Sequence, residues 1–247
     1  MSPLLLILRS LLHHWRANAA VAAGVAVGTA VLIGALLVGD SMRGSLTRLA
    51  VDRLGRVDEA LVTEHFFGAS LAEKVSGTST NDCPAAPVIM LQTAVAAADS
   101  DAPRQVANVK LIGSDERFWR LAKGGLKSPP QAKEIVLNQP LADRLGVHPG
   151  DAVLLRLPKL SAIPADSALG RKRETVRSQR VTVREIIPAT GLGRFGLQPT
   201  QQEPLLAYVS LAWLQDQLEQ PRRVNAILLA GKRSGTFQPD LSDYGLH

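Results

Sequence analysis

Hydrophobic residues are unevenly distributed along this chain, and their strongest concentration lies near the N-terminus. Residues 19–38 carry no charge and show no polar stripe at helical spacing. As an α-helix this run would be ~30 Å long, which is the thickness of the hydrocarbon core of a bilayer. The pattern therefore favours a transmembrane helix over 17–39. A cleaved export signal and a buried core helix are the alternatives, but the first has a shorter apolar region and the second a polar face.

The predicted span is rich in small residues. Gly24 and Gly28 are four positions apart and form a G-x-x-x-G pair. Small residues at this spacing let a second helix approach closely in lipid, where packing drives helix association. We expect a helix-packing face here, although glycine is also simply tolerated in membrane helices.

The segments on either side of the span are amphipathic. In 1–16, leucines recur at helical spacing opposite basic residues, which predicts an interfacial helix with Trp15 and Arg16 as anchors at headgroup depth. In 40–60, apolar residues again recur at helical spacing, which predicts a helical stalk and a strand beginning near Glu59. More positive residues follow the span than precede it, but long translocated domains obey that count poorly, so we expect the N-terminus inside.

Short alternating and helical patterns fill 61–247 and predict a mixed α+β domain. Turn residues separate the patterns. A Ser-, Thr- and Pro-rich loop is expected over 76–87. The expected strands are 88–98, 104–113, 133–138, 152–157, 179–187 and 224–231, and the expected helices are 114–122, 139–147 and 210–220.

Capping residues set the expected helix ends. Ser114 and Ser210 stand where N-caps are expected, Gly146 where a left-handed C-terminal stop is expected, and Pro221 closes the last helix.

Composition adds a basic charge to this picture. The chain has 247 residues, 46% of them hydrophobic but only 4% aromatic, and a net charge of +6. Because no stacking aromatics lie between the basic residues, the charge favours an anionic bilayer surface and argues against nucleic acid as a partner. Basic residues cluster in the loop 164–180, which we expect to be solvated. The single cysteine, Cys83, permits no intrachain disulfide and has no metal-ligand partner nearby in sequence.

Candidate chemistry is sparse. The stretch 191–196, GLGRFG, matches a dinucleotide fingerprint, but Pro199 and Pro204 follow it where a helix should begin, so we expect a glycine-rich turn. The sequence holds no Walker A motif, zinc-protease motif or nucleophile elbow. We therefore expect a chain that is not an enzyme, with no catalytic, cofactor-binding or metal-binding residues and no cofactor.

Three stretches resemble a known family. They are GDSMRGSLTRLAVDRLGRVDEALV after the span, VKLIGSDERFWRL in the domain, and IVLNQPLADRLGVHPGDAVLLRL, which contains the pattern LGV..GD. With the order of parts, they resemble the FtsX-like or MacB-like permeases of ABC transport systems. The resemblance implies that 61–247 is an extracytoplasmic MacB-like core domain, incomplete at its C-terminus, because members of the family have three further spans.

The resemblance also implies a role and partners. Such permeases act as homo- or heterodimers in the inner (plasma) membrane, with a separate ATPase subunit that binds ATP, and serve in export or mechanotransmission. The alternative is a single-span protein whose extracytoplasmic domain binds or scaffolds partners at the cell envelope. Such a simple anchor would not need a helix-packing face at Gly24 and Gly28.

Overall fold

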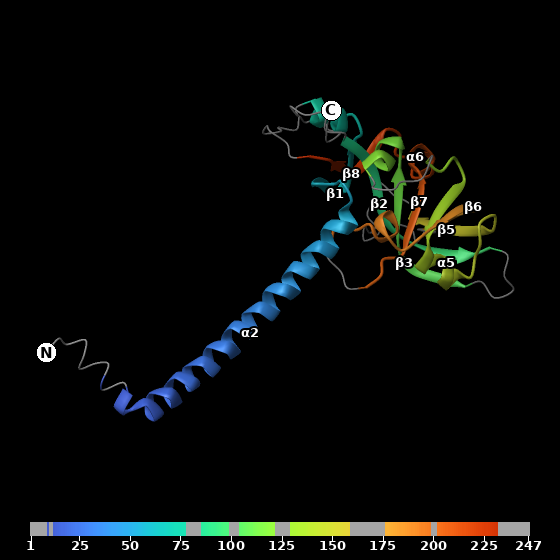
Figure 1. The fold of residues 1–247 in the computed structure, drawn as a ribbon. Coiled ribbons are helices and arrows are strands. Elements are labelled where there is room, and N and C mark those ends of the chain that lie inside the picture. Colours follow the sequence, from blue (N-terminus) through green and yellow to red (C-terminus); the bar gives the residue numbers. More distant parts are fainter. Residues whose placement is uncertain are drawn as a thin grey trace, which may run out of the picture. The chain divides into compact units, whose positions relative to one another are not determined.

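The computed structural model describes residues 9, 12–77, 85–98, 104–121, 129–158, 176–198 and 202–231. The chain forms two compact units, Met1–Leu49 and Ala50–His247. The first consists mainly of a helix, and the second is built around a sheet with short helices (Figure 1). The predicted fold class, an N-terminal apolar helix followed by a mixed α+β domain, is confirmed.

One long helix, α2 (Trp15–Leu54), takes in most of the segments predicted as span and stalk. The helix ends at Leu54 because Gly55 adopts a left-handed conformation, with φ of 66°. The helical stalk is therefore shorter than predicted, and residues 55–58 lead directly into a strand. Of the predicted interfacial helix 1–16, residues 1–8, 10 and 11 lie outside the described part, and Trp15 and Arg16 form the start of α2.

Among the described residues, eight strands form the sheet of the second unit, and five short helices lie between them in the chain. The strands are β1 (Glu59–Gly68), β2 (Ala85–Ala97), β3 (Gln105–Ser114), β4 (Glu134–Asn138), β5 (Ala152–Pro158), β6 (Val176–Ile187), β7 (Leu206–Ser210) and β8 (Arg223–Leu229). The helices are α3 (Leu71–Gly77), α4 (Glu116–Leu121), α5 (Gln139–Leu145), the 3-10 helix η1 (Gly191–Arg194) and α6 (Leu211–Gln217). Helix α3 and strand β7 were not predicted.

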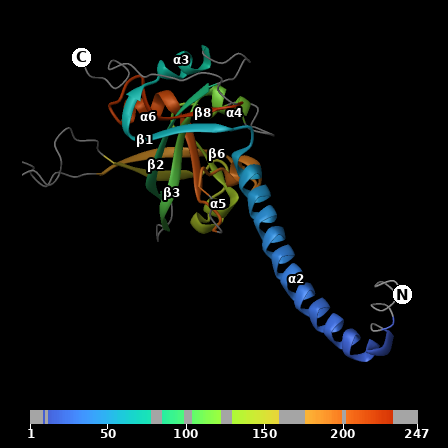
Figure 2. The ribbon, with the colours of Figure 1, turned by 90° about the vertical axis from the view of Figure 1, so that its left-hand side faces the viewer.

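The order of the strands is β1-β8-β2-β3-β7-β4-β6-β5, and β5 also pairs with β2. The second pairing closes six strands into a ring, in the order β2, β3, β7, β4, β6 and β5. It is possible because β2 is long: residues 85–88 pair with β8, and residues 94–97 pair with β5. Strands β8 and β1 extend the sheet beyond the ring, and β1 lies on its near side in Figure 2.

Two apolar cores lie on opposite faces of the sheet. The larger core takes a β-branched residue, no more than 1% exposed, from every strand of the ring. These are Val95, Val109, Ile135, Val153, Val181 and Val209. The smaller core lies under α4 and η1 and contains Phe118, Trp119, Phe195 and Tyr208. Successive side chains of β7 point to opposite faces of the sheet, so Ala207 packs in the larger core and Tyr208 in the smaller.

The caps of the short helices differ in part from the prediction. Gly146 ends α5 in the left-handed conformation, as predicted. Ser210 occupies the N-cap position of α6, but its side chain makes no capping hydrogen bond. Ser114 does not cap α4: the next residue, Asp115, accepts hydrogen bonds from the backbone N–H groups of Arg117 and Phe118. Ser114 is instead the buried last residue of β3.

Candidate functional site

The first candidate site is the apolar part of α2. The segment Trp15–Arg48 has 34 residues and a window of mean hydropathy 2.4, none of which is buried, so its length and composition suffice to cross a membrane. Gly24 and Gly28 lie exposed on this helix, and a Cβ added at either would meet no atom within 4 Å. Their role as a packing face is a prediction about a partner helix that lies outside this chain.

The predicted interfacial anchors lie at the start of α2. Trp15 is 64% exposed, and the neighbouring Arg16 is exposed as well. Both side chains are therefore free of tertiary packing in the first unit. That exposure suits residues expected at headgroup depth, where tryptophan and arginine are common.

The segment that follows α2 is fixed within the second unit. The backbone N–H of Arg56 donates to the carbonyl of Leu121 at the end of α4. The N–H of Asp58 donates to the carbonyl of Leu229 in β8, and its carboxylate accepts from the N–H of Gly231 at 2.6 Å. Residues 55–58 are therefore hydrogen-bonded to two elements of the domain and do not form a free linker.

A buried asparagine, Asn138, joins several segments of the chain at the C-terminal end of β4. Asn138 is fully buried at the end of β4, and its side chain makes four hydrogen bonds. Its Nδ2 donates to the carbonyls of Gly193 and Pro204 at 2.8 and 2.7 Å. Its Oδ1 accepts from the N–H groups of Leu141 and Leu206. One side chain therefore satisfies polar groups of α5, of η1 and of the entry to β7.

The GLGRFG segment acts as a packed turn, as predicted. It forms η1, and the described residues that follow, 195–198, are not helical. A Cβ at Gly193 would lie 1.8 Å from the carbonyl oxygen of Pro188, so only glycine fits there. The hydroxyl of Tyr208 donates to the carbonyl of Leu192 at 2.6 Å, and burial raises the pKa of that phenol far above its usual range. These contacts tie the segment to β7 and leave it with a structural role.

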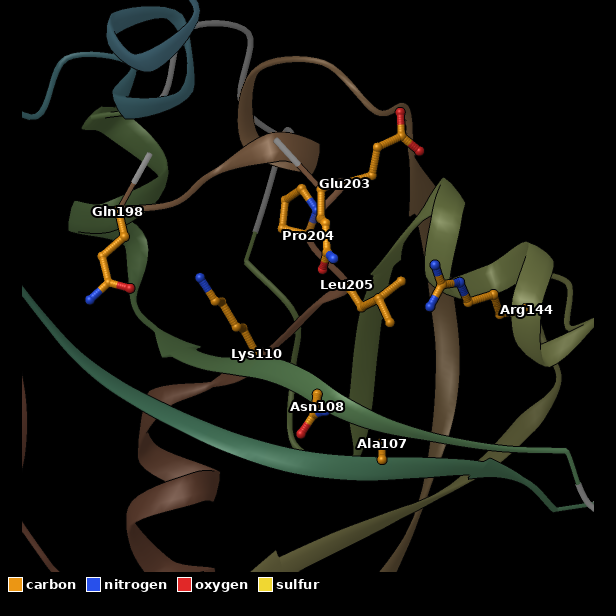
Figure 3. A pocket seen from close by; sticks show the side chains of 9 residues that line it. Ala107, Asn108, Lys110, Arg144, Gln198, Glu203, Pro204 and Leu205 are labelled. Atoms are coloured by element: carbon orange, nitrogen blue, oxygen red, sulfur yellow. The ribbon is translucent and has the colours of Figure 1, made fainter. Parts of the chain in front are cut away.

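A polar hollow of about 760 Å³ lies over β3, near the point where it begins to pair with β7. Its floor includes Pro204 and Leu205, both buried, and its walls carry Asn108, Lys110 and Gln198. Arg144 on α5 reaches in from the side (Figure 3). No local pattern in the sequence indicates this site, because its side chains come from β3, from α5, from Gln198 and from residues 202–205.

Other chemistry is limited in the part of the chain that the structure describes. No group of three or more His, Cys, Asp or Glu side chains there could hold a metal ion. Cys83 and the basic residues Arg171, Lys172 and Arg173 lie outside that part.

Comparison with known proteins gives distant structural similarity only. No family model matches the sequence, and no curated protein matches it. The periplasmic region of MacB from Actinobacillus actinomycetemcomitans is similar over 75% of this chain and 79% of that one, with 10% identity and a TM-score of 0.41.

A second similar structure is the extracellular domain of YknZ, a noncanonic ABC-type transporter from Gram-positive bacteria. The similarity covers 76% of this chain and 89% of that one, with 9% identity and a TM-score of 0.42. At this level of similarity the chain is assigned to no family.

Proposed function

We propose that this chain is a membrane component of an ABC-type export or mechanotransmission system, a permease subunit that is not itself catalytic. The observation that carries the proposal is α2, a helix that is apolar and exposed along its first part and reaches the folded domain after only residues 55–58.

An exposed apolar helix of this kind needs an apolar environment. Val25, Val27, Leu32 and Leu37 are each 64–68% exposed, and at helical spacing they point in several directions around the helix. Burial of apolar surface is the main favourable term in folding, so a water-exposed helix of this composition would be unfavourable. A bilayer with a partner helix on the Gly24 and Gly28 face would cover this surface.

The contacts after α2 support a role in transmitting movement. Because the N–H groups of Arg56 and Asp58 bond to α4 and β8, a displacement of the last turn of α2 would act on the sheet directly. A flexible linker would absorb such a displacement. A mechanotransmission subunit needs this kind of connection, whereas a passive anchor does not.

The proposal includes the surroundings of the chain. We place α2 in the inner (plasma) membrane, the domain on the extracytoplasmic side, and a second permease subunit against α2. A separate ATPase subunit would bind the ATP, since the sequence has no Walker A motif.

Co-purification tests the proposal. The tagged full chain is extracted from membranes of its native host in mild detergent, and ATP hydrolysis is measured in the purified material. We expect a co-purifying ATPase subunit whose activity vanadate inhibits. Recovery of the chain without an ATP-hydrolysing partner, both in detergent and after cross-linking in the membrane, would favour the single-span scaffold instead.

A further inference from the structure

The hollow over β3 carries positive charge without a matching negative charge. Lys110 is half-buried in β3, and Arg144 is exposed on α5. The acidic side chain at the rim, Glu203, pairs with Arg194 at 3.2 Å, and in Figure 3 its carboxylate points away from both cations. Among the described residues, no carboxylate lies within ion-pair distance of Lys110 or Arg144.

A bulge in the sheet shapes the hollow. Thr93 of β2 pairs with Val109, but Val95 pairs with Val106, so β3 has one more residue than β2 between these pairs. Asn108 takes up the difference in the left-handed conformation, with φ of 57°. Bulges bend a strand and redirect its side chains, and they are common beside binding sites. The sheet itself, and not only a surface loop, therefore forms one wall of the hollow.

The remaining walls suit a peptide. The side-chain amides of Asn108 and Gln198 can each donate and accept hydrogen bonds, and a peptide group requires both. A phosphate diester offers acceptors only and would leave the amide oxygens unused, and inorganic phosphate has no donor and acceptor at the spacing of a peptide group. The apolar floor at Pro204 and Leu205 and the volume of about 760 Å³ fit a short segment of chain.

We propose that this hollow binds an acidic peptide segment of a partner protein. Carboxylates of the segment pair with Lys110 and Arg144, while its backbone bonds to the amides of Asn108 and Gln198. The proposal concerns the domain alone and does not depend on the membrane role proposed above.

The test uses the full chain in a neutral detergent and a fluorescent peptide of alternating Glu and Gly with blocked ends. Saturable binding that weakens with salt is expected for the wild type. The double variant Lys110→Met, Arg144→Gln should bind about tenfold more weakly, because two partly exposed ion pairs are lost. The matched control is Arg156→Gln, which removes an exposed arginine of β5 outside the hollow and should bind as the wild type does.

Four results would overturn the proposal. Three of them are absence of saturable binding, equal binding of a peptide with Gln in place of Glu, and equal loss of binding in the Arg156→Gln control. Inorganic phosphate that displaces the peptide as well as unlabelled peptide does would also contradict it, because the site would then be a general anion site. Thermal unfolding checks that the double variant is folded; if it is not, the exposed single variant Arg144→Gln carries the same comparison.

Discussion

At the scale of single residues, Asn138 and Gly193 contribute more to the packing of the domain than an asparagine or a glycine usually does. Asn138 joins α5, η1 and the entry to β7 through four hydrogen bonds. Gly193 permits a close approach between η1 and the carbonyl of Pro188. The two residues are in direct contact, because the side-chain amide of Asn138 donates a hydrogen bond to the carbonyl of Gly193. At the C-terminal end of β4, the structure therefore depends on buried hydrogen bonds and on close backbone contact as much as on apolar packing.

Replacing Asn138 with Ala should destabilise the domain strongly. The change leaves backbone groups of Leu141, Leu206, Gly193 and Pro204 without their partner in a buried site, which we expect to cost about 4 kcal/mol of the free energy of unfolding. Chemical denaturation of the detergent-solubilised chain measures this loss. The neighbouring Gln139→Ala removes only an exposed side-chain hydrogen bond to Asp143, so a similar loss there would contradict the explanation.

The two glycines of the GLGRFG segment provide a matched pair. Gly193→Ala places a Cβ 1.8 Å from the carbonyl oxygen of Pro188, which forces the backbone to move and should cost about 3 kcal/mol. In Gly196→Ala the nearest atom is 3.9 Å away, so unfolding should change little. Thermal unfolding compares the two variants. Equal midpoints would show that close packing at Gly193 does not stabilise this turn.

At the scale of elements, local patterns predicted most of the strands and helices but not their arrangement. The apolar run of α2, the alternation in β3 to β6, and the stop at Gly146 are properties of neighbouring residues. The ring could not be predicted, because it depends on which half of β2 meets β5 and which meets β8. The same limit explains the hollow, whose cations lie on β3 and α5, far apart in the sequence.

Part of the role of Asn138 could have been predicted from the sequence. An asparagine directly before a helix with proline in its first turn is a recognisable capping signal, and the bond from Leu141 to its Oδ1 follows from that signal. Its bonds to Gly193, Pro204 and Leu206 join segments more than fifty residues away, which no local pattern indicates.

The packing face proposed on α2 belongs to this scale as well. Gly24→Leu with Gly28→Leu should abolish close helix association and shift the chain in membranes from dimer to monomer. Cross-linking in native membranes measures the change. Gly34→Leu with Gly44→Leu, the same two changes on another face of the helix, serves as the control. If both variants dimerise as the wild type does, the glycine pair is not a packing face, and the passive anchor gains support.

At the scale of the whole molecule, the proposed role joins a lipid-embedded helix to a closed sheet. Most of α2 lies in the first compact unit and its last turn in the second, where residues 55–58 follow it with hydrogen bonds to α4 and β8. The charge of +6 is compatible with a domain near an anionic bilayer surface. The hollow over β3 gives the domain a surface on which a partner could act.

The most direct test of the central claim asks whether α2 crosses the membrane. Single cysteines are placed at Arg16 and at the exposed Arg156 in a Cys83→Ser background, and each variant is treated in spheroplasts with a membrane-impermeant maleimide. We predict that Arg156→Cys is labelled in sealed cells and that Arg16→Cys is labelled only after the membrane is permeabilised. Labelling of both positions, or of neither, in sealed cells would place them on one side and contradict a membrane-spanning α2.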